Sequence, residues 1–214
     1  MSNNVPALSY GSELKRKALH LGALAMPAGL LVLGRTAALL VLVPLALAAV
    51  FCDVARQRWA WMHRFIGWVF GPIMRPEEQP PFGGPIVLNG ATWMCVSAAL
   101  CAALFPEPVA AAALAMLMVG DGAAAVVGRR YGRHRYPFGG AAAKSLEGSA
   151  AFFATGLLTA LPLAAVAAPG HAPLTPLQLG LGALAATVVE ALPIPVNDNV
   201  RVPFVAGLVM GLAA

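Results

Sequence analysis

Charged residues are scarce in this sequence. Only 11% of its 214 residues are Asp, Glu, Lys or Arg, whereas 59% are hydrophobic and the mean hydropathy is +0.76. Soluble domains carry about 25% charged residues, so the shortage argues against a soluble domain and predicts a chain built for a lipid bilayer. Glycine and proline are plentiful, with 22 and 18 residues, as expected where transmembrane helices pack closely and break.

Other absences exclude further classes of protein. The three cysteines have no CxxC or zinc-ligand spacing, which argues against a disulfide framework or a zinc site. No basic stripe with interleaved aromatic residues is present, so nucleic acid is not expected as a partner. No repeat or soluble domain interrupts the chain, which predicts a single domain over residues 1–214. No small-residue cleavage site follows the apolar run after Lys15–Lys17, so we expect a retained first helix rather than a signal peptide.

Apolar runs define the expected architecture, an all-α integral membrane protein with about seven transmembrane helices, the last one short. A spanning helix needs about 20 residues, so the first two segments are slightly short. Between the second and third segments, the 53–80 linker mixes Trp, Phe and Arg. This predicts an interfacial helix on the cytoplasmic leaflet, the alternative being a solvated loop. The segments are Ala18–Leu33, Thr36–Phe51, Ile86–Phe105, Val109–Gly128, Leu146–Ala168, Pro176–Leu192 and Val202–Ala214.

The basic residues alternate between loops. All Lys and Arg residues except Arg35 lie at 15–17, 56–75, 129–144 or 201, and the other intervening loops, "FPEPV" and "PGHAPLTP", contain none. Under the positive-inside rule the N-terminus and every basic loop are cytoplasmic. With this orientation, Glu107 is the one acid on the opposite side.

With this orientation, the polar residues lie mostly on one side of the membrane. Ionisable groups at the edge of membrane helices are costly and need a reason, and here they gather toward the cytoplasmic face. A transporter would place binding groups near the membrane midplane, with polar residues along the access routes from both sides. The pattern favours an interfacial enzyme that takes one substrate from water and one from lipid. The polar residues on this side include Lys17, His20, Asp53, Asn89, Thr92, Asp121, Lys144, Glu147, Glu190, Asn197, Asp198 and Asn199.

The stretch "VGDGAAAVVGRRYG" combines an acid with small residues. Asp121, Gly128 and Gly132 follow helical spacing, so a carboxylate begins a face of small side chains. Close helix packing through Gly120, Ala124 and Gly128 would explain the small residues. It would not explain Asp121, which suits a metal ligand or a paired charge. The arginines that follow, Arg129 and Arg130 among them, are typical of topology and anionic-lipid contact, with a substrate phosphate as the alternative.

The loop "GGAAAKSLEGS" resembles a phosphate-binding loop without matching it, because Ala143 stands where that motif needs a glycine. Ser145 suits the N-cap of the next helix and Glu147 its first turn. Lys144 is a cation beside a helix N-terminus, which opposes the dipole. A bound phosphate would resolve this conflict, and Gly139 and Gly140 would allow close backbone approach.

The stretch "VVEALPIPVNDNVRVP" adds a second acidic cluster. Glu190 lies near a helix end that two prolines terminate, and Asp198 follows between two asparagines. An Asx-rich turn would explain the asparagines. Two acids near the Asp121 and Lys144 elements also suggest oxygen ligands for Mg²⁺ with a nucleoside triphosphate.

These segments together resemble the CTP-dependent lipid kinases, which include dolichol kinase, phytol kinase and the yeast-type diacylglycerol kinase with their small bacterial relatives. The resemblance covers most of the chain, and "GDGAAAVVGRRYG", "KSLEGSAAFF" and "VEALPIPVNDNVRVP" carry it after "ELKRKALHLGAL" and "MRPEEQPPFGGPIVLNGATW". The chain is shorter than eukaryotic dolichol kinases, which favours the phytol-kinase-like or diacylglycerol-kinase-like branch. It lacks the C-terminal signature of phosphatidate cytidylyltransferases.

The resemblance implies transfer of the γ-phosphoryl group of CTP, or of another nucleotide, to a lipid alcohol at the cytoplasmic face of a multi-pass protein. A cytidylyltransferase acting on a lipid phosphate and a non-enzymatic lipid transporter are the alternatives. Nothing in the sequence indicates an oligomeric state. The implied catalytic residues are Asp121, Lys144, Asp198, Glu190 and His20. The implied nucleotide-binding residues are Gly128, Arg129, Arg130, Gly132, Lys144, Ser145, Glu147, Gly148, Lys17 and Asn197. The implied ligands of Mg²⁺, or of Mn²⁺ or Ca²⁺ in its place, are Asp121, Asp198 and Glu147.

Overall fold

The computed structural model describes residues 18–138, 143–165 and 172–213, and this part of the chain is helical throughout its regular structure. The only β-type pairing in these residues is an isolated antiparallel bridge between Arg135 and Ser145. The all-α prediction is thereby confirmed. The α-helices are α2 (Ala25–Arg58), α3 (Ala60–Phe70), α4 (Gly90–Leu104), α5 (Glu107–Tyr131), α6 (Leu146–Ala165), α7 (Pro176–Ala191) and α8 (Asp198–Leu212).

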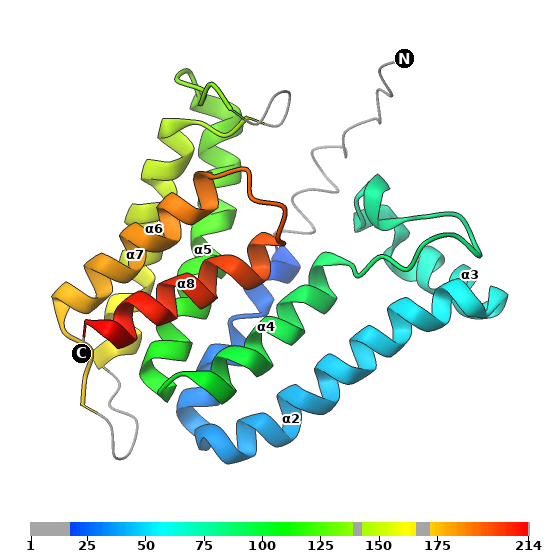
Figure 1. The fold of residues 1–214 in the computed structure, drawn as a ribbon, viewed down its shortest axis with the longest axis horizontal. Helices are drawn as coiled ribbons and strands as arrows, with labels where there is room; N and C mark the ends of the chain where they lie inside the picture. The colour runs from blue at the N-terminus through cyan, green and yellow to red at the C-terminus, as the bar shows by residue number, and fades with distance from the viewer. Residues whose placement is uncertain (1–17, 139–142, 166–171, 214) are drawn as a thin grey trace.

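The first two predicted segments are joined at a sharp bend inside α2. Gly34 has φ 77° and ψ 166°, a backbone conformation that is essentially restricted to glycine. Figure 1 shows the chain changing direction here, at the lower left of the bundle. The backbone N–H of Arg35 donates to Glu107 Oε1 at 2.7 Å, and its guanidinium donates to the Phe105 carbonyl at 2.5 Å. Arg35, the one basic residue outside the basic loops, and Glu107, the one acid predicted on the opposite side, thus fix the same corner.

The central element is α5, which contacts α2, α4, α6, α7 and α8. Its first twelve residues, 107–118, are all buried, in keeping with an apolar character on every side. Alanine predominates in this stretch, so neighbouring helices can approach closely. Figure 1 shows α5 running through the bundle with α6 beside it, and both extend past the link between α7 and α8.

The linker between α2 and α4 contains the predicted extra helix, which is α3. It begins later than expected, because α2 continues to Arg58 instead of ending near Phe51. Asp53 and Arg56 lie one turn apart and form an ion pair inside that extension. After α3, two short 3₁₀ turns, η1 (Gly71–Ile73) and η2 (Pro76–Glu78), lead back to α4.

The C-terminal helices α7 and α8 pack against each other and against α5. The Gln178 side chain in α7 donates to the Met210 carbonyl in α8 at 3.1 Å. Helix α8 begins at Asp198, one turn before the predicted Val202, because the Asn197 side chain caps it by accepting from the Asn199 N–H. The "NDN" sequence is therefore a helix start.

In the described residues, two helical segments are long and apolar enough to cross a membrane, Ala18–Arg58, which contains the Gly34 bend, and Glu107–Tyr131. Helices α4 and α7 are apolar but shorter. The seven-span topology therefore stays a prediction. The outer surface is strongly apolar, with Val32, Leu40 and Leu47 among many large hydrophobic residues exposed on α2.

Candidate active site

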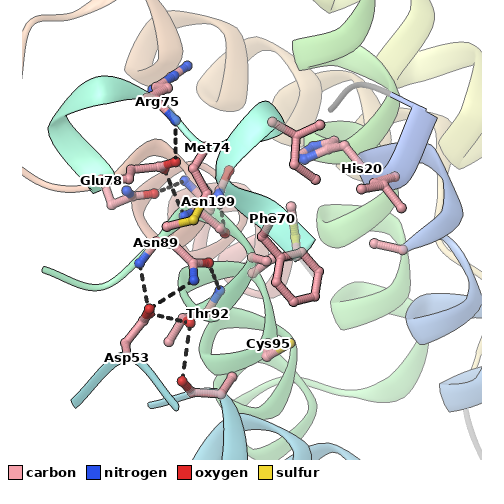
Figure 2. Close-up of a pocket in the computed structure, with 18 of the residues that line it drawn as sticks. His20, Asp53, Phe70, Met74, Arg75, Glu78, Asn89, Thr92, Cys95 and Asn199 are labelled. Atoms are coloured by element: carbon pink, nitrogen blue, oxygen red, sulfur yellow. Dashed lines mark hydrogen bonds between the residues drawn. The ribbon is translucent and has the colours of Figure 1, made fainter. Parts of the chain in front are cut away.

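A cavity of about 730 Å³ opens between the start of the first helix, α3, α4 and the beginning of α8 (Figure 2). Four of the predicted site residues line it: His20, Asp121, Asn197 and Asp198. His20 Nε2 lies 3.9 Å from Asp121 Oδ2. Three helices that are distant in sequence thus bring an imidazole and two carboxylates to one cavity.

One wall of the cavity is a buried polar network centred on Asp53. The carboxylate accepts hydrogen bonds from the Asn89 N–H at 2.8 Å, from the Asn89 side chain at 2.9 Å and from the Thr92 hydroxyl at 2.6 Å. Arg56 Nε lies 3.0 Å from Asp53 Oδ1, and its guanidinium also donates to the Val87 carbonyl. Buried charges need such partners. The network joins the end of α2 to the start of α4 and leaves this carboxylate fully engaged (Figure 2).

A second set of hydrogen bonds closes the loop side of the cavity. Glu78 accepts from the backbone N–H groups of Arg75 and Gly90, each at 2.9 Å. Asn199 at the start of α8 donates to the Gly90 carbonyl at 2.8 Å. The 3₁₀ turn η2, α4 and α8 are therefore fixed to one another at Gly90 (Figure 2).

Lys144 lies beside the cavity in a salt-bridge cluster. Its Nζ is 2.6 Å from Glu190 Oε1 and 3.0 Å from Asp198 Oδ2, and it donates to the Glu190 carbonyl at 2.5 Å. Arg201 pairs with the other Asp198 oxygen. Glu190 is buried, whereas Asp198 is 37% exposed. The negative charge expected beside Lys144 is thus supplied by two carboxylates of the chain itself.

The predicted glycine positions serve helix packing. A Cβ on Gly132 would lie 2.2 Å from the Gly128 carbonyl and 2.6 Å from Ser145 Oγ, and one on Gly148 would lie 3.2 Å from the Ala124 carbonyl and from Ser145 Oγ. Ser145 is buried and accepts from the Gly148 N–H, as an N-cap does. These four residues bring α5 against the start of α6 and do not line the cavity.

The remaining predicted residues lie further along this end of the bundle. Glu147 accepts from His134, with 2.7 Å between Oε1 and Nδ1. Arg129 and Arg130 occupy the last turn of α5. None of the three predicted residues Glu147, Arg129 and Arg130 lines the cavity. Lys17, Gly139 and Gly140 lie outside the described residues.

The three predicted metal ligands do not form one group. Among the residues that the structure describes, no three His, Cys, Asp or Glu side chains are arranged to hold a metal ion. Asp121 and Asp198 share the cavity, whereas Glu147 is engaged by His134.

Sequence reasoning gave no role to several residues that form the cavity wall. The sequence marks Asp53, Asn89 and Thr92 only as polar residues expected on the cytoplasmic side, and it gives Arg75 and Glu78 no role within their loop. A signal was present, because an Asn that begins an apolar run is a typical helix N-cap. Its link to an acid 36 residues earlier could not be found without the fold.

Comparison with known proteins agrees with the resemblance. A probable phytol kinase of Triticum aestivum is 43% identical over 110 residues, which cover 48% of this chain and 36% of the wheat protein. The CTP-dependent diacylglycerol kinase 1 of Schizosaccharomyces pombe is 31% identical over 105 residues, which cover 49% of this chain and 44% of the yeast protein. An uncharacterised protein of Rickettsia prowazekii is 28% identical over 152 residues, which cover 71% of each.

The matched part spans little more than a third of the length of the wheat protein. No family model matches the chain, and no solved structure matches it. The relatives with named activities are phytol kinases and a CTP-dependent diacylglycerol kinase. Over about half its length the chain is similar to these lipid kinases, which agrees with the resemblance to the CTP-dependent lipid kinases.

Proposed function

We propose that the chain is a nucleotide-dependent kinase that phosphorylates the hydroxyl of a membrane lipid alcohol, with CTP as the donor. One observation carries the proposal. Asp198 lines the cavity and also pairs with Lys144. The apolar-walled cavity and a cationic side chain therefore meet at the Asp198 carboxylate. Phosphoryl transfer depends mainly on positioning and charge neutralisation, and such a junction can bring a lipid hydroxyl to a phosphate.

The residues divide between two substrates. On the nucleotide side, Lys144 supplies positive charge beside the start of α6 for phosphate oxygens, with Arg129 and Arg130 at the end of α5. On the acceptor side, His20 and Asp121 stand 3.9 Å apart at the cavity. His20, or a carboxylate that does not bind the metal ion, can accept the hydroxyl proton as the new bond to phosphorus forms. Glu190 holds Lys144 in place from the buried side.

The carboxylates fit a magnesium ion. Mg²⁺ is commonly held by one or two protein carboxylates together with substrate phosphates, so a group of three protein ligands is not needed. Asp121 and Asp198, which share the cavity, would hold it, and Glu147 would not. When bound, the ion neutralises charge on the transferring phosphoryl group.

A multi-pass membrane setting accompanies this function, with the N-terminus and the site at the cytoplasmic face. The distribution of basic loops supports this orientation. The many exposed Leu, Val, Phe and Trp side chains support a lipid-facing surface, because soluble proteins rarely expose large contiguous apolar areas. The exposed aromatic residues of α3 suit the interfacial region.

Radiolabelled CTP tests the reaction. Label from the γ-phosphate should appear on phytol, farnesol, polyprenol or diacylglycerol when purified protein is supplied with Mg²⁺. Label from the α-phosphate on lipid would indicate a cytidylyltransferase instead. No turnover with any nucleotide and alcohol would contradict both enzymatic functions, and transport of a lipid in liposomes would then favour the third alternative.

Two variants connect the activity to the site. We expect Asp121→Asn to lose most turnover while Glu77→Gln, an exposed carboxylate outside the cavity, keeps it. Lys144→Ala should also be inactive, but it leaves the buried Glu190 without its partner. The pair Lys144→Ala/Glu190→Gln removes both charges and should restore folding, measured by gel filtration in detergent, without activity. Full activity in Asp121→Asn or in this pair would refute the assignment.

A further inference from the structure

Two aspartate–arginine pairs, each one helical turn apart, have different surroundings. Asp53 pairs with Arg56, also accepts hydrogen bonds from uncharged donors of α4 and its cap, and is 1% exposed. Asp198 pairs with Arg201 but accepts from no uncharged donor among the contacts described. Its other oxygen lies 3.0 Å from Lys144 Nζ, and the side chain is 37% exposed. The first carboxylate is fixed by the fold, whereas the second is held by two cations and is open to exchange.

Arg201 is a buried cation with an incomplete set of partners. Its side chain is 9% exposed, and its described contacts run from Nε and Nη2 to Asp198 Oδ1. Nη1 is buried and has no hydrogen-bond partner in the described part of the chain. Arg56, by comparison, also donates to the Val87 carbonyl. Because a buried charge is costly unless it is paired and hydrogen-bonded, the Arg201 guanidinium suits an anion with more acceptor oxygens than one carboxylate.

Lys144 keeps its place without Asp198. Its Nζ lies 2.6 Å from Glu190 Oε1 and donates to the Glu190 carbonyl, and Glu190 is buried in α7. Asp198 can therefore move away without releasing Lys144. Asp198 also lies in the first turn of α8, where the helix dipole favours negative charge. Two cations and a helix start thus surround one place for an anion.

A phosphate group has the chemistry for this place. It carries more charge and more acceptor oxygens than a carboxylate, and a guanidinium can bind it through two parallel N–H donors. A phosphate that pairs with both cations releases the Asp198 carboxylate, which lines the cavity. Because Mg²⁺ is commonly held by one or two carboxylates together with substrate phosphates, the released carboxylate can then serve the ion.

We propose that Arg201 is a phosphate-binding residue and that Asp198 is an internal counter-anion, which a phosphate displaces from Lys144 and Arg201. Displacement makes Asp198 available to the metal ion, so phosphate and metal strengthen each other's binding. The phosphate belongs to a nucleotide or to a phosphorylated lipid. Its assignment to CTP rests on the proposed function, but its binding can be measured without turnover.

Calorimetric titration of CTP into purified protein in nanodiscs, with EDTA and without a lipid alcohol, tests the exchange. Asp198→Asn should bind metal-free CTP several-fold more tightly than the wild type, because the competing carboxylate is gone. Arg201→Gln should bind it roughly tenfold more weakly, as expected when a hydrogen bond to a charged group is lost.

Arg58→Gln is the matched control. It removes the same charge from an exposed position that does not line the cavity, so it should bind CTP as the wild type does. Unchanged or weaker metal-free binding in Asp198→Asn, or equal affinities in Arg201→Gln and Arg58→Gln, would exclude CTP as the ligand of this site.

Magnesium tests the coupling. Mg²⁺ should strengthen CTP binding more in the wild type than in Asp198→Asn, because only the wild type releases a carboxylate to the ion. An equal gain in both proteins would contradict the exchange.

A double variant keeps the test open if a single variant does not fold. Asp198→Asn/Arg201→Gln removes both charges of the pair, so it leaves no buried cation without its partner. It should bind metal-free CTP more weakly than Asp198→Asn and more tightly than Arg201→Gln. Any other order would contradict the exchange.

Phytyl phosphate in the same nanodiscs tests the other source of the phosphate. If Arg201 binds a phosphorylated lipid, the rise in Tm that phytyl phosphate produces should fall in Arg201→Gln and persist in Arg58→Gln, while CTP binds both variants alike. Binding that is insensitive to Arg201 with both ligands would overturn the proposal.

Binding and turnover can fail independently. The expected affinities without phosphate transfer to any alcohol would support the Arg201 site and contradict the kinase function. Phosphate transfer in a protein whose ligand affinities do not depend on Arg201 would do the reverse.

Discussion

Gly120 and Gly122 are two residues apart in α5 and have opposite surroundings. A Cβ on Gly120 would lie 2.9 Å from the ring of Phe152, which is fully buried in α6, whereas a Cβ on Gly122 would meet nothing within 4 Å. Close approach of two helices requires glycine at the first position and not at the second. The small-residue face of α5 is therefore in large part a packing surface.

Alanine at these two positions should have opposite effects on stability. Gly120→Ala pushes against a buried ring, and overpacking costs about 1–3 kcal/mol. Gly122→Ala should be neutral or stabilising by up to about 1 kcal/mol, because alanine is the better helix former. Thermal unfolding in detergent should give a lower Tm for the first and an equal or higher Tm for the second. Equal shifts would show that the Gly120–Phe152 contact does not limit the packing.

Single residues also mark the limit of sequence reasoning. The N-cap role of Ser145 follows from residue type and position alone, and the structure confirms it. The partners of Lys144 do not, because Glu190 and Asp198 lie 46 and 54 residues away. Local physics indicated that an anion was needed, but only the tertiary fold determines whether that anion is a phosphate or a side chain.

At the scale of elements, the joint between α2 and α4 depends on one buried carboxylate. Asp53 has 1% relative exposure and is held by Asn89 and Thr92 from α4. Breaking one contact of a buried charge costs more than breaking a neutral hydrogen bond, because the charge stays away from water.

Thr92→Val removes the hydroxyl that donates to Asp53 and keeps the side-chain shape. We expect a loss of about 1.5–3 kcal/mol in stability, the usual range for hydrogen bonds to charged groups. Thr187→Val is the control, because the Thr187 hydroxyl donates only to the Ala183 carbonyl of its own helix, among the contacts described. A thermal or denaturant scan should give a clearly larger loss for Thr92→Val, and comparable losses would indicate that the Asp53 network adds little.

The course of the elements could largely be predicted, and the differences have local causes. Apolar runs located α4 to α7 within a few residues. Helix α8 begins earlier than its apolar run because Asn197 caps it, and α2 ends later because Asp53 and Arg56 form a pair within it. A hydropathy profile does not register that polar residues pair with one another. It therefore predicts such helices to be shorter than they are. The cavity could not be predicted, because its wall joins six separate stretches of the chain.

At the scale of the whole molecule, the expected topology places both ends of the α5–α6 pair on defined sides of a bilayer. The loop after α5 carries arginines, whereas the segment before α7 has no basic residue. The first should face the cytoplasm and the second the opposite side.

Cysteine labelling tests this topology. In a chain with Cys52, Cys95 and Cys101 replaced by alanine, Arg133→Cys should react with a membrane-impermeant maleimide in inside-out vesicles and not in intact cells. Ala172→Cys should react in intact cells. The cysteine-free chain controls for background. Labelling of both positions from the same side would contradict the predicted number of spans between them.

The enclosure of α5 has a consequence for biosynthesis. This helix leaves the ribosome before α6, α7 and α8, which cover much of its surface, and it carries Asp121 with it. Membrane helices associate by packing and hydrogen bonding after insertion, so α5 has to remain incompletely assembled until the later helices arrive. The C-terminal third therefore completes the packing around a helix that is made before it. We expect a chain interrupted after Tyr131 to be removed by membrane proteolysis.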